Sequence, residues 1–456
     1  MRGADITSDL DKPEIVWLGD DFTGAAAVME VLTFAGMPSI LFLDTPTPEQ
    51  LAVSKGFKAF GIATMARAQP PEWMAENLPS FYAFLDGTGA ALVHYKICST
   101  LDSSPRIGSI GRAIELACDQ FGASAVPVVT AAPRMQRYQI FGNLFCGAGS
   151  EVYRLDRHPV MARHPVTPMR EADVALHLAE QTDIQTYCLD HNGLSDPARL
   201  RACLDRQGDA GICTIDMSDD RHERIVGRLL WEGRQKNRFV VGSQGIEYAL
   251  VAHFLEAGKL TENAPPKSLD PTSRMAVVSG SVSPITAAQI GWARQNGFAA
   301  IRLDVLKICS GEAGRAEAEL AAIDGAKSAL SEGLIPLVFS AEGPDDPAVA
   351  ALRASDTDPA VANTLLGQSL GRILKRLIDD TGLGRVVVSG GDTSGLVCGE
   401  LGVFALEAVS PTIPGAALCR ARSNTGLDGL EIALKGGQMG SQDYFGWIRD
   451  GGGERS

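Results

Sequence analysis

Short apolar runs alternate with longer helical patterns along most of the 456-residue chain, and this alternation constrains the fold more than any other feature. In the first half we expect strands at 15–18, 39–43, 126–130, 185–189 and 239–241, and helices at 25–35, 107–121, 171–181 and 246–256. In the second half we expect strands at 275–279, 299–303, 337–340 and 385–389, and helices at 285–295, 313–331 and 363–380. Strands that alternate with helices form βαβ units, so the pattern predicts an α/β fold with largely parallel sheets.

A polar stretch at 258–273 separates the two series and contains three prolines with little apolar periodicity. We expect it to link two α/β domains, at 1–257 and 274–456, because the chain is too long for one ordinary core. Ligands of parallel sheets bind beyond the carboxyl ends of the strands. We therefore expect the substrates to bind in a cleft between the two domains.

The composition limits which classes of molecule the chain is expected to bind. The formal net charge is −14, which argues against a nucleic-acid partner because that affinity comes from neutralising phosphates. The nine cysteines are scattered without a C-x-x-C pair, as is typical of thiols in a reducing cytoplasm. The polar first residues are unlike a signal peptide, and no apolar run of about 18 residues predicts a membrane span. We expect a cytoplasmic protein without a membrane partner, and the sequence leaves its oligomeric state open, a homo-oligomer included.

Three loops rich in glycine and serine follow apolar strands in the second half: 279–284 (SGSVSP), 389–394 (SGGDTS) and 435–440 (KGGQMG). Small residues let the backbone approach a ligand closely, and N–H groups at a helix N-terminus favour anions. One such loop alone is more often an ordinary turn, but three in one predicted domain favour nucleotide binding. Neither G-x-x-x-x-G-K-[ST] nor G-x-G-x-x-G occurs, so neither a P-loop nor a dinucleotide-binding fold is predicted.

Polar side chains follow two apolar runs of the first half. Asp20 and Asp21 stand at the first strand-to-helix turn, where one could accept a proton from a substrate hydroxyl and the other could bind hydroxyls or a metal. Capping of the next helix is the structural alternative, and the two roles are compatible. Lys96 precedes a dense cluster of Ser, Thr and Asp, where it could bind a carboxylate or the transferred phosphoryl group. A solvated strand end is the alternative for Lys96.

Two arginines and a histidine are further candidates. Arg163 and His164 lie in a loop with two prolines. Arg163 could hold a carboxylate with two hydrogen bonds, and His164 could act as acid, base or hydrogen-bond donor. Arg67 is a lone cation after a mostly apolar run. For each arginine the alternative is an ordinary surface residue.

Together these motifs resemble the four-carbon acid sugar kinase family, which contains the 3-oxo-tetronate, threonate and erythronate kinases. The resemblance runs from about residue 16 to 445 and rests on six motifs in order: DDFTG (20–24), YKICST (95–100), HPVTPM (164–169), SGS (279–281), GGDTS (390–394) and KGG (435–437). It implies an N-terminal domain that binds a sugar acid and a C-terminal domain that binds ATP. It also implies transfer of a phosphoryl group to a terminal hydroxyl, usually the 4-hydroxyl, of a four-carbon acid.

The resemblance also implies roles for individual residues. It places six residues on the substrate side: Asp20, Asp21, Arg67, Lys96, Arg163 and His164. Of these, we predict that Asp21, with Asp20 and Lys96, is catalytic, and that Arg67, Arg163 and His164 bind the acid. The residues implied to bind ATP are Ser279, Gly280, Ser281, Ser283, Gly390, Gly391, Asp392, Thr393 and Gly436. Mg²⁺ is expected with ATP, but its ligands are not assigned.

Two departures from the family pattern leave alternatives open. The last glycine-rich loop has Gln438 and Met439, and the residues around Arg67 lack the hydroxyls that relatives often carry. The change in the loop concerns side-chain contacts with ATP, whereas the change around Arg67 leaves a branched acid such as 3-oxo-isoapionate as an alternative substrate. A nicotinamide-dependent oxidoreductase is an alternative enzyme, although the dinucleotide fingerprint is missing. A non-catalytic sugar-acid-binding protein is a third hypothesis, against which the intact Asp20–Asp21 pair argues.

Overall fold

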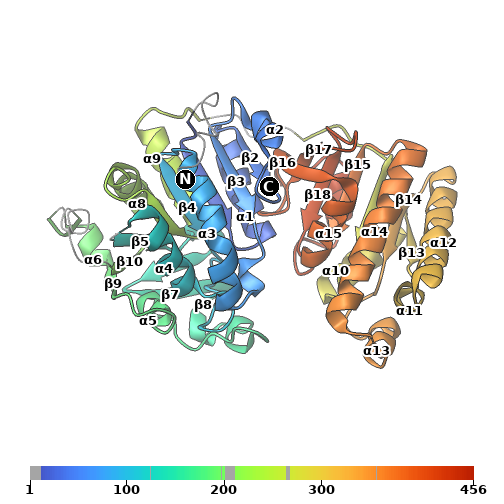
Figure 1. The fold of residues 1–456 in the computed structure, drawn as a ribbon, viewed down its shortest axis with the longest axis horizontal. Helices are drawn as coiled ribbons and strands as arrows, with labels where there is room; N and C mark the ends of the chain where they lie inside the picture. Colours follow the sequence, from blue (N-terminus) through green and yellow to red (C-terminus); the bar gives the residue numbers. More distant parts are fainter. Residues whose placement is uncertain are drawn as a thin grey trace. The chain divides into compact units, whose positions relative to one another are not determined.

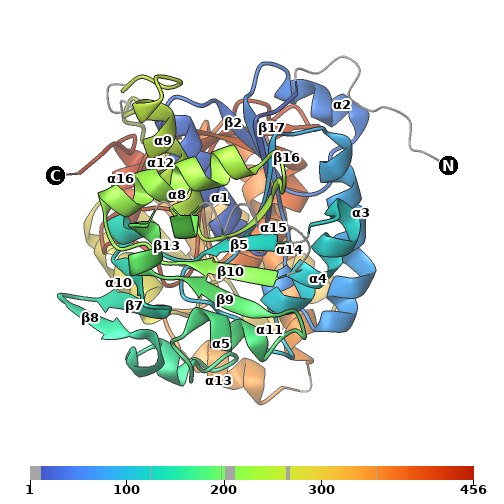
Figure 2. The ribbon, with the colours of Figure 1, turned by 90° about the vertical axis from the view of Figure 1, so that its left-hand side faces the viewer.

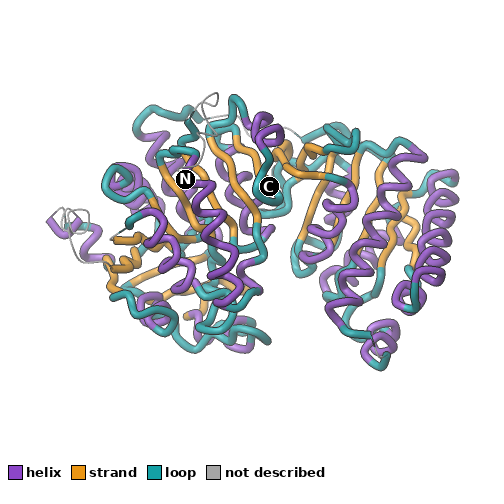
Figure 3. Tube along the Cα trace, viewed as in Figure 1, coloured by secondary structure: helices purple, strands orange, loops and turns teal. Residues whose placement is uncertain are grey.

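A computed structural model describes residues 12–123, 125–196, 198–200, 211–262, 268–355 and 357–455. The chain divides into two compact units, Met1–Asn263 and Ala264–Ser456, each of which is described here by itself. Helices and strands alternate in both units, so the predicted α/β class is confirmed (Figure 3). Within the predicted linker 258–273, residues 263–267 lie outside the described residues, whereas Leu269 and Thr272 donate backbone hydrogen bonds to Gly451 and Arg449.

The first unit is built on one parallel sheet. Its eight strands follow the order β2 (Ser39–Phe42), β3 (Ala59–Ala63), β1 (Ile15–Gly19), β4 (Leu92–Lys96), β11 (Phe239–Gly242), β5 (Ala125–Val129), β10 (Gly211–Ile215) and β9 (Thr186–Leu189). Every pair of neighbours is parallel. Strands β1 to β4 are buried along their whole length, which explains their nearly continuous apolar sequences.

Helices cover both faces of this sheet. Figure 2 shows α8 (Asp220–Gly233) and α9 (Gly245–Glu256) on one side of the strands, and α3 (Pro71–Gly87) and α4 (Ile110–Phe121) on the other. Helix α1 (Phe22–Phe34) packs against α9. The predicted helix at 107–121 begins later, at Ile110, because the Ser109 side chain accepts a hydrogen bond from the N–H of Arg112 at 3.1 Å and caps the helix there.

A small antiparallel sheet of the first unit was not predicted. It consists of β6 (Arg137–Ile140), β7 (Asn143–Ala148) and β8 (Glu151–Arg154). These strands are partly exposed and carry polar side chains, so they lack the apolar run that marks a buried strand. The buried carboxylate of Asp216 holds the first turn by accepting the N–H groups of Phe141 and Gly142. Strands β3 and β10 and helices α3 and α8 were also missing from the predicted elements.

The second unit contains five parallel and two antiparallel strands. The order is β13 (Phe298–Arg302), β14 (Ile335–Phe339), β12 (Met275–Ser279), β15 (Arg385–Ser389), β18 (Glu431–Lys435), β17 (Leu418–Ser423) and β16 (Val403–Ser410). The first five are parallel, and β17 runs antiparallel to both β18 and β16. Strands β17 and β16 therefore form an antiparallel edge of the sheet.

Long helices flank this second sheet. Helix α14 (Pro359–Thr381) packs against α12 (Glu312–Ser331) and α15 (Gly391–Leu401), and Figure 1 shows α12 and α14 in front of the strands. Helices α10 (Pro284–Gln295) and α16 (Tyr444–Arg449) pack against each other, and their buried residues join those of the strands in one apolar core. No helix in the described ranges is both long enough and apolar enough to cross a membrane.

Candidate active site

The first candidate site lies where three neighbouring strands of the first unit end. Gly19, the last residue of β1, pairs with Ala63 of β3 and with Lys96 of β4. Two backbone hydrogen bonds continue this order beyond the strands: Asp20 donates to the carbonyl of Lys96 at 3.0 Å, and Arg67 donates to the carbonyl of Asp20 at 2.9 Å. The sheet therefore brings together candidates that are far apart in the sequence.

The guanidinium of Arg67 bridges the two carboxylates. Its Nε and Nη2 donate to the two oxygens of Asp20 at 3.1 and 2.6 Å, and Nη2 also lies 2.6 Å from Oδ1 of Asp21. The Asp20 side chain is 5% exposed, against 27% for Asp21. Burial raises the pKa of Asp20, and the positive charge of Arg67 opposes that rise. Burial would lower the pKa of Arg67, but the two carboxylates raise it, so the arginine stays charged.

A lysine and a glycine complete this cluster. Lys96 is buried, and its Nζ donates to the carbonyl of Ile97 at 2.7 Å. Burial lowers the pKa of Lys96, and the charges of Asp20 and Asp21 oppose that change. A Cβ atom on Gly24 would lie 2.4 Å from Oδ1 of Asp21 and 2.9 Å from Nζ of Lys96. Only glycine at this position leaves the charged groups where they are.

The two carboxylates differ in what they offer a ligand. Both oxygens of Asp20 accept hydrogen bonds from Arg67. Asp21 caps α1 by accepting the N–H of Gly24 at 2.9 Å, and this bond and the bond from Arg67 both end at Oδ1. Within the described residues, Oδ2 of Asp21 accepts no hydrogen bond, so it can accept one from a substrate hydroxyl. Asp21 therefore caps the helix through Oδ1 and leaves Oδ2 without a described partner.

A second group in the first unit surrounds His164. The N–H of Thr167 donates to its Nδ1 at 3.1 Å, so Nδ1 is an acceptor and the neutral ring carries its proton on Nε2. Asp102 accepts the hydroxyl proton of Thr167, and its Oδ1 lies 3.7 Å from Nδ1 of His164. The loops after β4 and around residue 164 are thus joined by side chains. His164 can donate a hydrogen bond from Nε2.

The two arginines that we predicted to bind the acid differ in their exposure and in their partners. Arg163 is exposed at the end of the short 3-10 helix η5 (Met161–Arg163), and it forms no hydrogen bond or ion pair with any described residue. Arg67 uses Nε and Nη2 for the two aspartates, and only Nη1 remains for a ligand. Their roles toward the acid stay predictions. Asp102 and Thr167 were not among the predicted site residues, although both stood inside recognised polar motifs.

The second candidate site lies at three adjacent strand ends of the second unit. The register pairs Ser279 of β12 with Ser389 of β15, and Ser389 with Lys435 of β18. The three predicted loops follow these strands and touch one another. A Cβ on Gly280 would lie 2.3 Å from Oγ1 of Thr393, and one on Gly437 would lie 2.3 Å from Oγ of Ser281.

Two helices begin at these loops. Ser283 caps α10 by accepting the N–H of Thr286 at 3.1 Å, and Pro284 occupies the first turn. Helix α15 begins at Gly391, directly after Gly390, whose φ of 131° is accessible to glycine and strained for other residues. The N-termini of both helices carry partial positive charge, so the arrangement suits an anion such as a nucleotide phosphate.

Thr286 and Lys435 connect the loops but were not among the predicted site residues. The hydroxyl of Thr286 lies 3.0 Å from Oγ of Ser281 and donates to the carbonyl of Gly437 at 2.9 Å. Nζ of Lys435 donates to the carbonyl of Gly436 at 3.0 Å and lies 3.4 Å from Oγ1 of Thr286. The sequence signal for Lys435 was its place between an apolar strand and two glycines. Thr286 gave no signal, because it lies inside a helix.

A preformed metal site is missing from the described part of the chain, where no three His, Cys, Asp or Glu residues are grouped so that they could hold an ion. Asp392, exposed in the first turn of α15, is the carboxylate contributed by the second-unit loops. Mg²⁺ usually binds through one or two carboxylates together with substrate phosphates and water. The residues present therefore fit a magnesium ion that arrives with a nucleotide.

Known proteins resemble both units. Residues 15–250 match a family model described as a sugar-binding N-terminal domain, and residues 276–445 match one described as a nucleotide-binding C-terminal domain. A 3-oxo-isoapionate kinase from Paraburkholderia graminis is 44% identical over 96% of this chain and 94% of that protein. A 3-oxo-tetronate kinase from Pseudomonas savastanoi pv. phaseolicola is 27% identical over 95% of this chain and 96% of that protein. A solved structure from Salmonella typhimurium LT2 covers 96% of this chain and 98% of its own, with a TM-score of 0.76 and 25% identity.

The matched domains correspond to the two units and supply one binding function for each substrate of a phosphoryl transfer. The second unit matches a nucleotide-binding domain, and nearly the whole chain is similar to kinases. Both findings argue against an oxidoreductase and against a non-catalytic binding protein. The chain belongs to the four-carbon acid sugar kinase family and is an ATP-dependent sugar-acid kinase.

Proposed function

We propose that the chain phosphorylates a branched sugar acid such as 3-oxo-isoapionate, rather than the unbranched four-carbon acid that its motifs first indicated. The observation that carries this proposal is the difference in identity between two relatives of similar coverage. The 3-oxo-isoapionate kinase is 44% identical to this chain, and the 3-oxo-tetronate kinase is 27% identical. The departure around Arg67, where the hydroxyl residues of many relatives are missing, is consistent with a different acid substrate.

In the proposed reaction, a hydroxyl oxygen of the acid forms a bond to the γ-phosphorus of ATP, and the bond from that phosphorus to the β–γ bridging oxygen breaks. Oδ2 of Asp21 accepts the hydroxyl proton, and ADP leaves with the electron pair of the broken bond. Phosphoryl transfer depends mainly on positioning and charge neutralisation, so a carboxylate of ordinary basicity is sufficient. Lys96 and Arg67 are positioned to stabilise negative charge beside Asp21.

The acid would be held by groups that the first unit leaves available. Arg163 is exposed and without a partner among the described residues, and His164 presents its Nε2 proton. Nη1 of Arg67 is a third donor close to Asp21. A planar guanidinium matches a carboxylate with two parallel hydrogen bonds, which makes Arg163 our first candidate for the acid group.

The second unit would hold ATP with its phosphates against the loops at 279–283 and 390–393, and the turn at Gly436 would close the site. Mg²⁺ would bind the phosphates, with Asp392 as the candidate protein ligand. When bound, the ion neutralises charge on the β- and γ-phosphates. The eight cysteines that the structure describes are free thiols, which fits a reducing compartment such as the cytoplasm.

A coupled assay of ADP release tests the substrate. The purified chain would be assayed with ATP-Mg and, separately, with 3-oxo-isoapionate, 3-oxo-tetronate, threonate and erythronate. The proposal predicts that kcat/KM is highest for 3-oxo-isoapionate, by about 100-fold or more, because a pocket shaped for another carbon skeleton loses several contacts at once. A higher kcat/KM for any of the unbranched acids would reject the branched substrate while leaving the kinase activity intact.

A further inference from the structure

One buried lysine of the second unit lacks a counter-charge. Lys435, the last residue of β18, is 1% exposed. No carboxylate in the described residues forms an ion pair with it, and burial lowers its pKa to about 8. Removing a charge from water without pairing it is costly, and the protein would be more stable with an apolar side chain there. Its position therefore needs an explanation other than stability.

The surroundings of Lys435 are neutral and polar. Its Nζ donates to the carbonyl of Gly436, and it lies 3.4 Å from Oγ1 of Thr286, which in turn donates to the carbonyl of Gly437. The neighbouring strand contributes Ser389, whose hydroxyl lies 3.5 Å from Oγ1 of Thr286. The ammonium therefore lies among hydroxyls and carbonyls at the point where the three loops meet.

Two further sources of positive potential point to the same place. Helix α10 has 12 residues and α15 has 11, and both begin at the loops that touch this cluster. Their N-terminal N–H groups add partial positive charge to the full charge of the lysine. In a region shielded from water these contributions are weakly screened, so together they favour an anion with more than one charge.

We infer that Lys435 is the cation that neutralises the nucleotide phosphates from inside the second unit, and that the phosphates supply the counter-charge that the lysine lacks. Because its side chain is buried, Lys435 acts through its electric field and by holding the turn at Gly436, and it is a positioning residue rather than a catalytic one. The inference rests on the proposed phosphate position and is independent of which acid is phosphorylated.

The test compares ADP with adenosine, which lacks the phosphates, by calorimetry on wild type and Lys435→Met. We expect Lys435→Met to raise the Kd for ADP about 30-fold or more, as is typical when one partner of a buried charge pair is removed. The Kd for adenosine should stay within about 2-fold, and the Tm of the ligand-free variant should equal or exceed that of wild type because a buried charge is gone. A residue with a merely structural role would instead lower the Tm and weaken both ligands alike.

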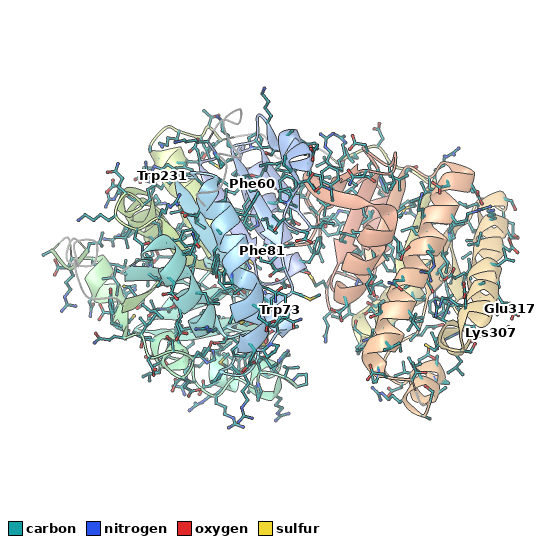
Figure 4. The ribbon with its side chains drawn as sticks, viewed as in Figure 1. Phe60, Trp73, Phe81, Trp231, Lys307 and Glu317 are labelled. Atoms are coloured by element: carbon teal, nitrogen blue, oxygen red, sulfur yellow. The ribbon has the colours of Figure 1, made fainter. Side chains whose placement is uncertain are left out.

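Lys307→Met is the matched control. Lys307 is an exposed lysine of the same unit whose Nζ forms a 2.6 Å ion pair with Glu317 (Figure 4). Removing this exposed charge should leave the Kd for ADP within about 2-fold of wild type, because exposed ion pairs contribute little. An equal loss of ADP binding in Lys307→Met and Lys435→Met would overturn the inference, because it would show a general effect of net charge. A rise of less than about 3-fold in the Kd for ADP of Lys435→Met would also overturn the inference, because a charge at the rim of a site has an effect of that size.

A measurement on the wild-type protein covers the case in which Lys435→Met does not fold. As the pH rises from about 7 to about 9.5, Lys435 loses its proton, and the affinity for ADP should fall while that for adenosine stays constant. The side chains that contact Nζ are uncharged, and the exposed Asp392 is the carboxylate that the neighbouring loops contribute. An ADP affinity that is independent of pH would overturn the inference. If wild type bound no ADP, the phosphate site and the role of Lys435 would both be rejected.

Discussion

Lys96 and Lys435 occupy equivalent places in the two units and have opposite electrostatic surroundings. Each is the last residue of a parallel strand, each is 1% exposed, and each donates to the carbonyl of the residue that follows it. Lys96 lies beside two aspartates, Asp20 and Asp21, and one arginine, Arg67, so the lysine offsets the excess negative charge of that cluster. The described groups that contact Nζ of Lys435 are neutral. The charges of the first cluster are thus paired within the protein, whereas the charge of Lys435 is not paired by a described carboxylate.

This difference matches the two tasks of a sugar-acid kinase. For the proposed proton transfer, Asp21 must accept a hydrogen bond from the substrate hydroxyl, and its Oδ2 is left without a described partner while Arg67 binds Oδ1. A site for a polyphosphate needs an excess of positive charge, which a lone buried lysine and two helix N-termini provide. In our proposal, the same strand-end position serves acid–base chemistry in one unit and anion binding in the other.

Asp21→Asn gives the largest effect that we expect, and it tests the proton-accepting half of the comparison. Turnover should fall about 10²-fold or more because an amide cannot accept the hydroxyl proton. Asn is as good a helix cap as Asp, so the Tm should change little. Steady-state kinetics with a parallel thermal melt would separate the two roles. Normal turnover would leave Asp21 with the capping role alone.

Lys96→Met should reduce turnover by at most about 10²-fold, because it removes one of the cations beside the reacting hydroxyl. It should also lower the Tm, because Asp20 and Asp21 would keep only Arg67 as a counter-charge. The same Lys→Met change is expected to have the opposite sign at position 435. Thermal melts of the two variants side by side therefore test the comparison, and shifts of the same sign would contradict it.

Arg163→Lys tests where the acid is held. Lysine keeps the charge but cannot form the two-point contact, so KM for the acid should rise about 10-fold while KM for ATP stays the same. Initial rates with each substrate varied in turn measure both constants. An equal change in both, or no change, would leave the carboxylate site of the first unit unassigned.

The smallest effect concerns stability and pH. The folded-state pKa of Lys435 is about 8, below its ordinary value of 10.5, so between these values the unfolded chain binds more protons than the folded one. Stability contributed by this group therefore rises with pH, by no more than about 1.4 kcal/mol per pH unit. Denaturant unfolding of wild type and Lys435→Met across this range should show the variant's advantage shrinking as the pH rises. An advantage independent of pH would mean that Lys435 is not the titrating group.

The sequence predicted the two-unit α/β organisation because buried parallel strands are nearly continuous apolar runs, as in β1 and β15. It failed for β6 to β8, whose exposed strands depend on the distant carboxylate of Asp216 for their turn. Asp20, Asp21 and Lys96 were each singled out from the sequence, and the register of β1 and β4 brings them together. The capture of Arg67 by the aspartates was not predicted, because a side-chain contact across 47 positions leaves no local pattern.

The most direct test of the account is a crystal structure of the protein with ADP bound. We predict that the two phosphates of ADP lie against the loops at 279–283 and 390–393, close to Lys435. No part of the nucleotide should contact the cluster of Asp20, Arg67 and Asp21. Phosphates bound at Lys96 and Arg67 instead would contradict the division of tasks between the two units, and would reject Lys435 as their counter-charge.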